Sequence, residues 1–246
     1  MLITIDNISC ECERGEYLTD IAARNGLVIP TLCHHEGLPG QGCCRVCIVE
    51  VETNGHSSIV TACVYPVERE CAVFTNSEKI SRQRRMILCF LRNLAPESSE
   101  IVRMCEEYSV PEYERLAMRE SGKCILCGLC VKACESLGTG AISTVNRGID
   151  KTVTTPYDEP SVVCAGCASC AKVCPTGAIT VTETEKKRTV WNKTFPLRFC
   201  KRCGKPIGTS VELKRSAAKS GAEIPVLCEM CRRKSIADVM VSTYGH

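Results

Sequence analysis

The chain has 246 residues, a formal net charge of +3 and 22 cysteines, twice as many as its phenylalanine, tryptophan and tyrosine residues together. This length allows two or three small domains, and the small, evenly mixed charge disfavours a nucleic-acid-binding surface. No stretch approaches the roughly 18 consecutive apolar residues of a membrane span, and the N-terminus lacks the pattern of a secretion signal. We therefore expect a cytoplasmic protein without a membrane or nucleic-acid partner. Its cysteines should bind metals, because a reducing cytosol does not accumulate structural disulfides.

The first predicted elements belong to a small domain at residues 1–77. Alternating apolar and polar residues predict strands at residues 2–5 and 48–52. Helical spacing predicts a helix at residues 17–25, which ends before Gly26. Strands, one helix, a cysteine-rich loop and further strands, in this order, are typical of a β-grasp domain.

A group of cysteines in this domain follows the pattern C-x10-C-x2-C-x15-C and consists of Cys33, Cys44, Cys47 and Cys63. Glycines in the first gap would let the backbone wrap closely around a cluster and direct N–H groups at its sulfurs. Cys43 is the alternative to Cys44, which we choose because it gives the two-residue spacing to Cys47. We expect His34 and His35 at the loop surface or at a subunit contact, although histidine replaces cysteine in Rieske centres.

Three segments carry these cysteines: Pro30-Thr-Leu-Cys-His-His-Glu-Gly-Leu, Gly42-Cys-Cys-Arg-Val-Cys-Ile-Val-Glu-Val and Thr61-Ala-Cys-Val-Tyr-Pro-Val. They resemble the 2Fe-2S domain at the start of the largest peripheral subunit of respiratory complex I, and its relatives in NAD-linked hydrogenases. The resemblance implies one 2Fe-2S cluster. The first gap is longer than in the plant-type C-x4-C-x2-C spacing, which also favours this variety.

Residues 78–120 are predicted to form a helical spacer. Ser77 is the expected N-cap of a helix that stops near Ala95-Pro96, and a second helix from about Ser99 to Tyr108 ends before Pro111. We expect the basic residues of this segment on a solvated or subunit-facing surface. These residues are Arg82, Arg84, Arg85 and Arg92.

Two further cysteine runs share the spacing C-x2-C-x2-C-x3-C, lie forty residues apart and are each followed by Gly-Ala-Ile, at Gly140 and Gly177. This internal repeat predicts a bacterial-type 2x4Fe-4S ferredoxin domain at residues 121–185. In such domains the fourth cysteine of each run ligates the other cluster. One 4Fe-4S cluster is therefore assigned to Cys124, Cys127, Cys130 and Cys174, and the other to Cys164, Cys167, Cys170 and Cys134.

The first run departs from its counterpart in two ways. It ends in Glu135 rather than proline, and its return to Gly140 is three residues longer than the second return. We expect ligation to survive both changes. The long segment between Cys134 and Cys164 is a candidate docking surface, with an ordinary surface loop as the alternative.

A C-terminal module at residues 186–246 contains two C-x2-C pairs, formed by Cys200, Cys203, Cys228 and Cys231. This pattern predicts a zinc-ribbon-like module with one zinc ion, and a third 4Fe-4S cluster is the alternative. The basic residues near these cysteines would offset the negative charge of the thiolates.

Six cysteines remain, and we expect most of them to be buried free thiols. They are Cys10, Cys12, Cys43, Cys71, Cys89 and Cys105. The chain has no Gly-x-Gly-x-x-Gly motif that opens a helix after a strand, no Walker loop and no Gly-x-Ser-x-Gly motif. No catalytic residue is predicted.

Residues 1–180 resemble the small electron-transfer subunit of soluble NAD(P)-linked flavoprotein complexes, namely hydrogenase diaphorases, formate dehydrogenases and bifurcating transhydrogenases. The resemblance implies an α+β fold and a role as a non-catalytic electron-transfer subunit. Its partners would be a flavin-containing NAD(P)H-oxidising subunit and a second redox subunit, such as a hydrogenase, a formate dehydrogenase or a ferredoxin-linked subunit, with electron bifurcation as an open question. The chain differs from the complex I subunit because residues 78–120 lack its histidine-containing 4Fe-4S motif.

Two other functions fit the sequence less well. A stand-alone ferredoxin-type electron carrier needs neither the helical spacer nor the C-terminal module. A redox-sensing regulator that binds DNA would need a recognition helix and a stronger charge bias.

Overall fold

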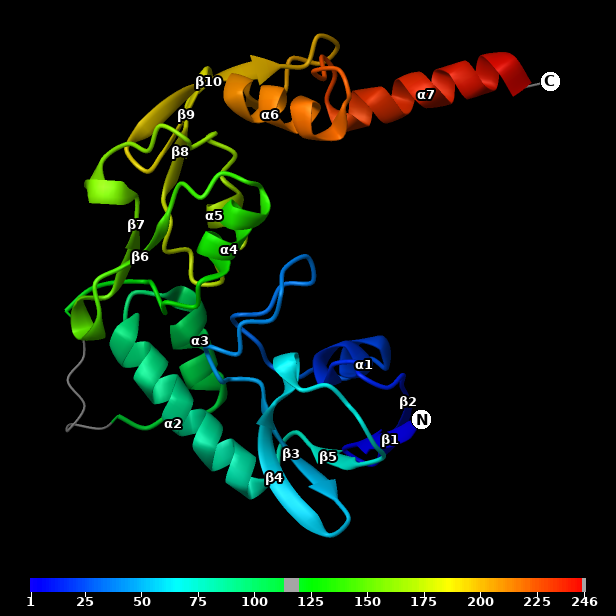
Figure 1. Cartoon of the computed structure of the whole chain (residues 1–246), viewed down its shortest axis with the longest axis vertical. Helices are drawn as coiled ribbons and strands as arrows, with labels where there is room; N and C mark the ends of the chain where they lie inside the picture. Colours follow the sequence, from blue (N-terminus) through cyan, green and yellow to red (C-terminus); the bar gives the residue numbers. More distant parts are fainter. Residues whose placement is uncertain (113–119, 245–246) are drawn as a thin grey trace. The chain divides into compact units, whose positions relative to one another are not determined.

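The structure, a computed structural model, describes residues 1–112 and 120–244 and has a mixed α+β fold (Figure 1). Its contacts divide the chain into two compact units. Unit 1 comprises residues 1–133 and 173–178, and unit 2 comprises residues 134–172 and 179–246.

Unit 1 begins with a five-stranded sheet in the order β2-β1-β5-β3-β4. Its strands are β1 (Leu2–Ile5), β2 (Ile8–Glu11), β3 (Ile48–Thr53), β4 (His56–Thr61) and β5 (Ala72–Phe74). β1 pairs parallel with β5, whereas its pairing with β2 and the pairing of β3 with β4 are antiparallel. The predicted strands at residues 2–5 and 48–52 are confirmed.

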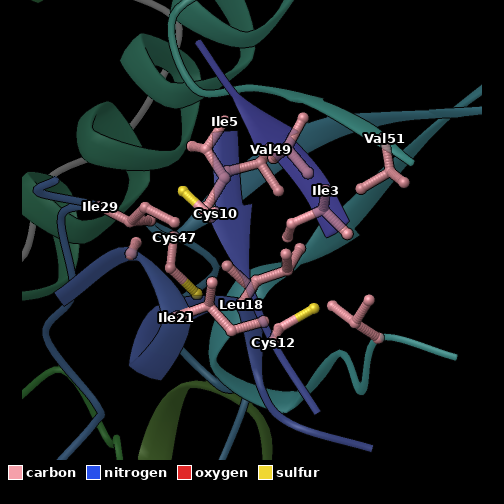
Figure 2. Packing of buried hydrophobic residues seen from close by; sticks show 14 of the residues in the cluster. Ile3, Ile5, Cys10, Cys12, Leu18, Ile21, Ile29, Cys47, Val49 and Val51 are labelled. Carbon is pink, nitrogen blue, oxygen red and sulfur yellow. The ribbon is translucent and has the colours of Figure 1, made fainter. Parts of the chain in front are cut away.

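Helix α1 (Leu18–Arg24) contributes to the core beneath this sheet. Tyr17 and Asn25 cap it, and Gly26 follows with a φ of 73°, so the predicted helix is confirmed. Leu18 and Ile21 pack with inward-facing residues of β1 and β3, including Ile3, as Figure 2 shows. Cys47 lies in the same core, so one cysteine of the first predicted site is buried among aliphatic side chains.

The helical spacer contains α2 (Glu78–Leu94) and α3 (Ser99–Glu107). The side chain of Ser77 accepts a hydrogen bond from the N–H of Ile80, and that of Ser98 accepts one from the N–H of Ile101. Such caps satisfy N–H groups that have no partner in the first turn of a helix. Both predicted helices are confirmed, while residues 113–119 of the predicted spacer lie outside the described part of the chain.

The predicted surface position of the basic residues on α2 is wrong for Arg84, which is completely buried. The buried stripe of this helix runs through Ile80, Arg84, Leu88 and Leu91, residues three or four positions apart. Arg82 and Arg85 are exposed. The sequence does not reveal this burial, because the charge of Arg84 interrupts the apolar face of the helix. Its backbone partners are also distant in the sequence.

A second core of unit 1 joins the spacer to two cysteine-containing loops. Leu88, Leu91 and Ile101 of the helices pack in one buried cluster. The same cluster contains Cys33 and Cys44 of the first predicted site, together with Cys127 of the second. Residues 62–64 form the short helix η1 (Ala62–Val64), which carries Cys63.

Unit 2 contains a two-stranded sheet of β6 (Ser143–Val145) and β7 (Thr152–Thr154) and a four-stranded sheet in the order β11-β10-β9-β8. The strands of the larger sheet are β8 (Val181–Glu183), β9 (Lys187–Val190), β10 (Lys193–Phe199) and β11 (Pro206–Thr209). The segment between Cys134 and Cys164 thus forms a hairpin with two short helices, η2 (Gly148–Asp150) and η3 (Pro156–Asp158).

The helices associated with unit 2 differ in length. Helix α4 (Leu129–Ser136) begins in unit 1 and ends in unit 2, and α5 (Ser169–Lys172) is a single turn. Helix α6 (Ser210–Ser220) contacts β10 and β11, and a capping box between Thr209 and Glu212 starts it. Helix α7 (Glu229–Tyr244) follows the second cysteine pair of the C-terminal module. None of the helices in the described ranges combines the length and the apolar character that crossing a bilayer requires.

Candidate iron–sulfur and metal sites

The first predicted site brings four buried thiols together in unit 1. Cys33, Cys44, Cys47 and Cys63 are each at most 6% exposed. The Sγ atoms of Cys47 and Cys63 lie 3.4 Å apart, and the N–H of Cys44 donates to Sγ of Cys33 at 3.3 Å. Thiolates are the ligand form of cysteine for iron–sulfur clusters, and backbone N–H groups stabilise their negative charge. The four side chains fit a 2Fe-2S cluster in both chemistry and burial.

Hydrogen bonds among these thiols shift their pKa values in opposite directions. Hydrogen bonds with the side chains of Cys44 and Cys63 lower the pKa of Cys33 to about 2. The hydrogen bond with Cys63 lowers the pKa of Cys47 to about 7, while the pKa values of Cys44 and Cys63 are raised. Neighbouring thiols of this group therefore compete for protons, as is expected at a site where a metal can take the place of those protons.

Gly40 allows the loop around this site to close. A Cβ atom at Gly40 would lie 2.7 Å from the carbonyl oxygen of Cys63 and 2.8 Å from Cγ1 of Val64. Real Cβ atoms do not approach backbone so closely, so only glycine fits here. At Gly37, in the same loop, the nearest atom would be Nδ1 of His35 at an ordinary 3.5 Å.

The residues among which the sequence left the ligand choice open lie in different surroundings. Cys43 is exposed, and its thiol contacts the carbonyl of Gln41, whereas Cys44 lies beside Cys33. Nδ1 of His35 accepts a hydrogen bond from the N–H of Gly37, which makes this residue part of the loop turn. His34 lies 3.9 Å from a carboxylate oxygen of Asp20.

The second predicted site also lies wholly within unit 1, because Cys174 belongs to the segment 173–178 that groups with residues 1–133. Burial raises the pKa of Cys127 to about 11 and that of Cys130 to about 12. The charges of Cys124 and Cys174 raise both values further, so all four cysteines are within electrostatic range of one another. The structure therefore brings Cys174 to the first run of the repeat.

The third predicted site lies wholly within unit 2, which contains Cys134 together with the second run. One small cavity of this unit is lined by all four cysteines, Cys134, Cys164, Cys167 and Cys170. Burial raises the pKa values of Cys164 and Cys170, and the charge of Cys134 contributes to both shifts. Each unit thus holds the four cysteines that the crossover assigns to one 4Fe-4S cluster.

The internal repeat is also visible in the backbone around the fourth cysteine of each run. The N–H of Ala141 donates to Sγ of Cys134 at 3.2 Å, and the N–H of Ala178 donates to Sγ of Cys174 at 3.3 Å. The longer return after Cys134 therefore preserves the same N–H to sulfur contact. The hydroxyls of Thr139 and Thr176 lie 2.9 and 3.6 Å from these two sulfurs.

Some contacts of these sites are beyond sequence reasoning. Nε1–H of Trp191 donates to Sγ of Cys170 at 3.5 Å. Trp191 follows β9, outside the repeat, so no motif identifies it. The two threonines could have been found, because Thr-Gly-Ala occurs at residues 139–141 and again at residues 176–178.

The four cysteines of the C-terminal module converge more tightly than those of the other sites. Sγ atoms of Cys200, Cys203, Cys228 and Cys231 all lie within 4.8 Å of one another. Cys200 and Cys203 lie in the connection between β10 and β11, while Cys228 directly precedes α7 and Cys231 lies in its first turn. A hydrogen bond from the N–H of Cys228 lowers the pKa of Cys200 to about 6, and burial raises that of Cys231 to about 12.

Five of the six other cysteines are buried or half-buried. Cys10 and Cys12 pack in the core beneath the five-stranded sheet, and Cys105 packs in the second core of unit 1. Cys89 is buried on α2, and Cys71 is half-buried. These residues behave as small hydrophobic side chains.

Comparisons with known proteins match the parts of the chain that contain the first three cysteine groups. Residues 1–78 match the family described as 2Fe-2S iron-sulfur cluster binding domain, and residues 123–178 match the family described as 4Fe-4S dicluster domain. The chain is 31% identical over 225 residues to the NADPH-Fe(3+) oxidoreductase subunit alpha of Geobacter sulfurreducens, covering 82% of this chain and 26% of that subunit. It is 31% identical to the NADP-reducing hydrogenase subunit HndD of Solidesulfovibrio fructosivorans, covering 73% of this chain and 36% of that one. The chain is a homologue of these subunits, and it contains a 2Fe-2S and a 4Fe-4S family domain.

The resemblance inferred from the cysteine motifs is therefore confirmed. The chain is also 29% identical to the NADH-ubiquinone oxidoreductase 75 kDa subunit of Reclinomonas americana, covering 72% of this chain and 29% of that subunit. It spans only about a quarter to a third of the length of these curated relatives. A chain in the crystal structure of an NAD+-reducing [NiFe]-hydrogenase in the H2-reduced state shares its fold, with a TM-score of 0.62, 23% identity and coverage of 85% of this chain and 91% of that one.

Replacing Gly40 with alanine is expected to reduce 2Fe-2S loading several-fold, because the added methyl group overlaps the backbone at Cys63. Gly37→Ala, in the same loop, should load like the wild type. Iron per chain and the visible absorbance of the reconstituted protein would measure both. Normal loading of Gly40→Ala would show that the loop does not close around a cluster as described.

The crossover predicts which cysteine variants behave alike. Cys174→Ser should abolish the same low-temperature paramagnetic resonance signal as Cys124→Ser, although Cys174 belongs to the other run. Cys134→Ser should match Cys164→Ser. The crossover is wrong if Cys174→Ser instead removes the signal that depends on Cys164.

Proposed function

We propose that the chain is an electron-transfer subunit that passes single electrons between a flavin-containing NAD(P)H-oxidising subunit and a second redox subunit. One 2Fe-2S cluster and two 4Fe-4S clusters would carry the electrons. The observation that supports this most directly is the second core of unit 1, in which Cys33 and Cys44 pack with Cys127. Ligands assigned to two different clusters thus share one water-excluding core.

This shared core favours electron transfer between the two sites. Cys33 acts on the pKa of Cys127 by its charge, so ligands of the two sites lie within electrostatic range. Gln41, in the first cysteine loop, has its amide oxygen 3.6 Å from where a Cβ of Gly128 would lie. Residues of the two loops are therefore neighbours in one buried core, which supports electron transfer between clusters held there.

The partners follow from the chemistry of the clusters and from the relatives. Nicotinamide nucleotides transfer two electrons as a hydride, whereas an iron–sulfur cluster accepts one electron at a time. A flavin must therefore mediate electron transfer between them. This sequence has no motif for either nucleotide or flavin. The relatives are named as subunits of an NADPH-linked, an NADP-linked and an NADH-linked oxidoreductase, which supports an NAD(P)-linked complex with a hydrogenase or another redox subunit as the second partner.

At the C-terminal site the sulfur geometry supports a single zinc ion over a third cluster. With Zn–S bonds of about 2.3 Å, the four sulfurs of a tetrahedral site lie about 3.8 Å apart. The Sγ atoms of Cys203 and Cys228 are 3.7 Å apart, and all four lie within 4.8 Å. A 4Fe-4S cluster binds each thiolate to a different iron at the corners of a larger cage, so its ligands stand farther apart.

The metal content tests these assignments. Anaerobically prepared protein should contain about ten irons and about one zinc per chain. Elemental analysis would measure both, with Cys203→Ser as the variant that should lose zinc and keep its iron. About fourteen irons without zinc would instead indicate a third 4Fe-4S cluster.

The electron-transfer role predicts a specific donor dependence. Dithionite should bleach the cluster absorbance of the isolated chain, whereas NADH and NADPH should not. The isolated chain provides no flavin that could accept a hydride and pass on single electrons. Addition of the flavin-containing partner should restore bleaching by the nucleotide. Anaerobic absorbance spectroscopy would follow both reactions, and rapid bleaching of the flavin-free chain by NADH would contradict the proposal.

A further inference from the structure

Arg84 of α2 is a charged side chain with no solvent exposure. Its guanidinium donates hydrogen bonds to the carbonyl oxygens of Val46 at 3.0 Å and Ile48 at 2.8 Å. It also donates to the carbonyl of Thr75 and to Oδ1 of Asn76, both at 3.0 Å. The ring of Tyr108 lies 5.6 Å from its central carbon.

All of these partners are neutral, so the charge of Arg84 is not cancelled by a carboxylate. Within the part of the chain that the structure describes, Arg84 forms no ion pair. Asp6 acts on it only through its field, because the oxygens of Asp6 accept hydrogen bonds from Thr75. Burial lowers the pKa of Arg84, but an arginine begins so far above neutrality that it remains charged.

The position of this charge is tied to the first cysteine site. Two of the three backbone carbonyls that Arg84 contacts belong to Val46 and Ile48, the residues on either side of Cys47 in the chain. The charge of the Cys47 thiolate also acts on the pKa of Arg84 and raises it, so the two groups lie within electrostatic range. A buried cation is costly unless an opposite charge is near. Four thiolates with a cluster would supply that charge.

We propose that Arg84 is the internal counter-charge of the 2Fe-2S site and raises the reduction potential of the cluster held there. This assignment rests on the proposed function, since it requires the cluster. An oxidised cluster with four thiolates carries a net charge of about −2, and reduction adds one electron without forming or breaking a bond. A fixed positive charge in a medium of low polarity stabilises the more negative, reduced form.

Arg84→Met tests the charge, because methionine fills a similar apolar volume without it. In the full chain, anaerobic redox titration of the 2Fe-2S resonance signal should show at least a tenfold fall in the one-electron reduction constant, a shift of 59 mV to more negative potential. Arg82→Met removes an exposed arginine from the same helix and should leave the potential unchanged. Arg84→Lys keeps the charge but loses the forked hydrogen bonds of the guanidinium. Its one-electron reduction constant should stay within threefold of the wild-type value.

A second variant leaves Arg84 in place. Asn76→Asp gives Arg84 a carboxylate partner at an existing hydrogen bond and should shift the potential in the same negative direction by a smaller amount. Gln83→Glu adds an equal charge at an exposed position of α2 and serves as its control. If Arg84→Met does not hold a cluster, the pair Asn76→Asp and Gln83→Glu decides the question.

Two results would overturn the assignment. One is a wild-type potential in cluster-loaded Arg84→Met or Asn76→Asp. The other is a shift in Arg84→Lys as large as that in Arg84→Met, since this would show that hydrogen bonding, and not charge, sets the potential. A wild-type chain without any 2Fe-2S signal would instead refute the proposed function, so the two failures are distinguishable.

Discussion

Metal binding requires that cysteine side chains be brought together, and the folds of both units bring such groups of cysteines together. In unit 1 the five-stranded sheet and the two spacer helices contribute apolar side chains to the cores that enclose Cys33, Cys44 and Cys47. Burial disfavours a free thiolate, as the raised pKa values of Cys127 and Cys130 show. The energy that a bound metal returns to these thiolates is therefore part of the folding energy.

Backbone N–H groups complement this burial at each site. Cys33, Cys134, Cys174 and Cys228 each accept one such hydrogen bond at sulfur. In the repeat this contact depends on a turn that ends in Gly-Ala, and it is retained although one return is three residues longer. The N–H to sulfur contact therefore follows the turn and not the length of the loop. Trp191 adds a side-chain donor to only one of the two runs.

Helix α2 packs against the cysteine loops of unit 1. Its apolar residues complete the core shared by two cysteine loops, and its buried arginine binds the backbone on both sides of Cys47. The helix therefore acts as a structural support that also carries charge. The arginine thereby places a cation against the backbone that carries Cys47.

The sequence by itself determined the cysteine groups, the internal repeat, the helices of the spacer and the relationship to iron–sulfur oxidoreductase subunits. These features are encoded locally, by residue spacing, capping residues and helical periodicity. Only the tertiary structure decided that Arg84 is buried, that Cys33 and Cys127 share a core, and that Trp191 contacts Cys170. Arg84 reaches carbonyl groups 38 and 36 positions away, and backbone carbonyls carry no sequence signature. Periodicity identifies an apolar face, but it cannot show where a charge finds enough backbone partners to be buried.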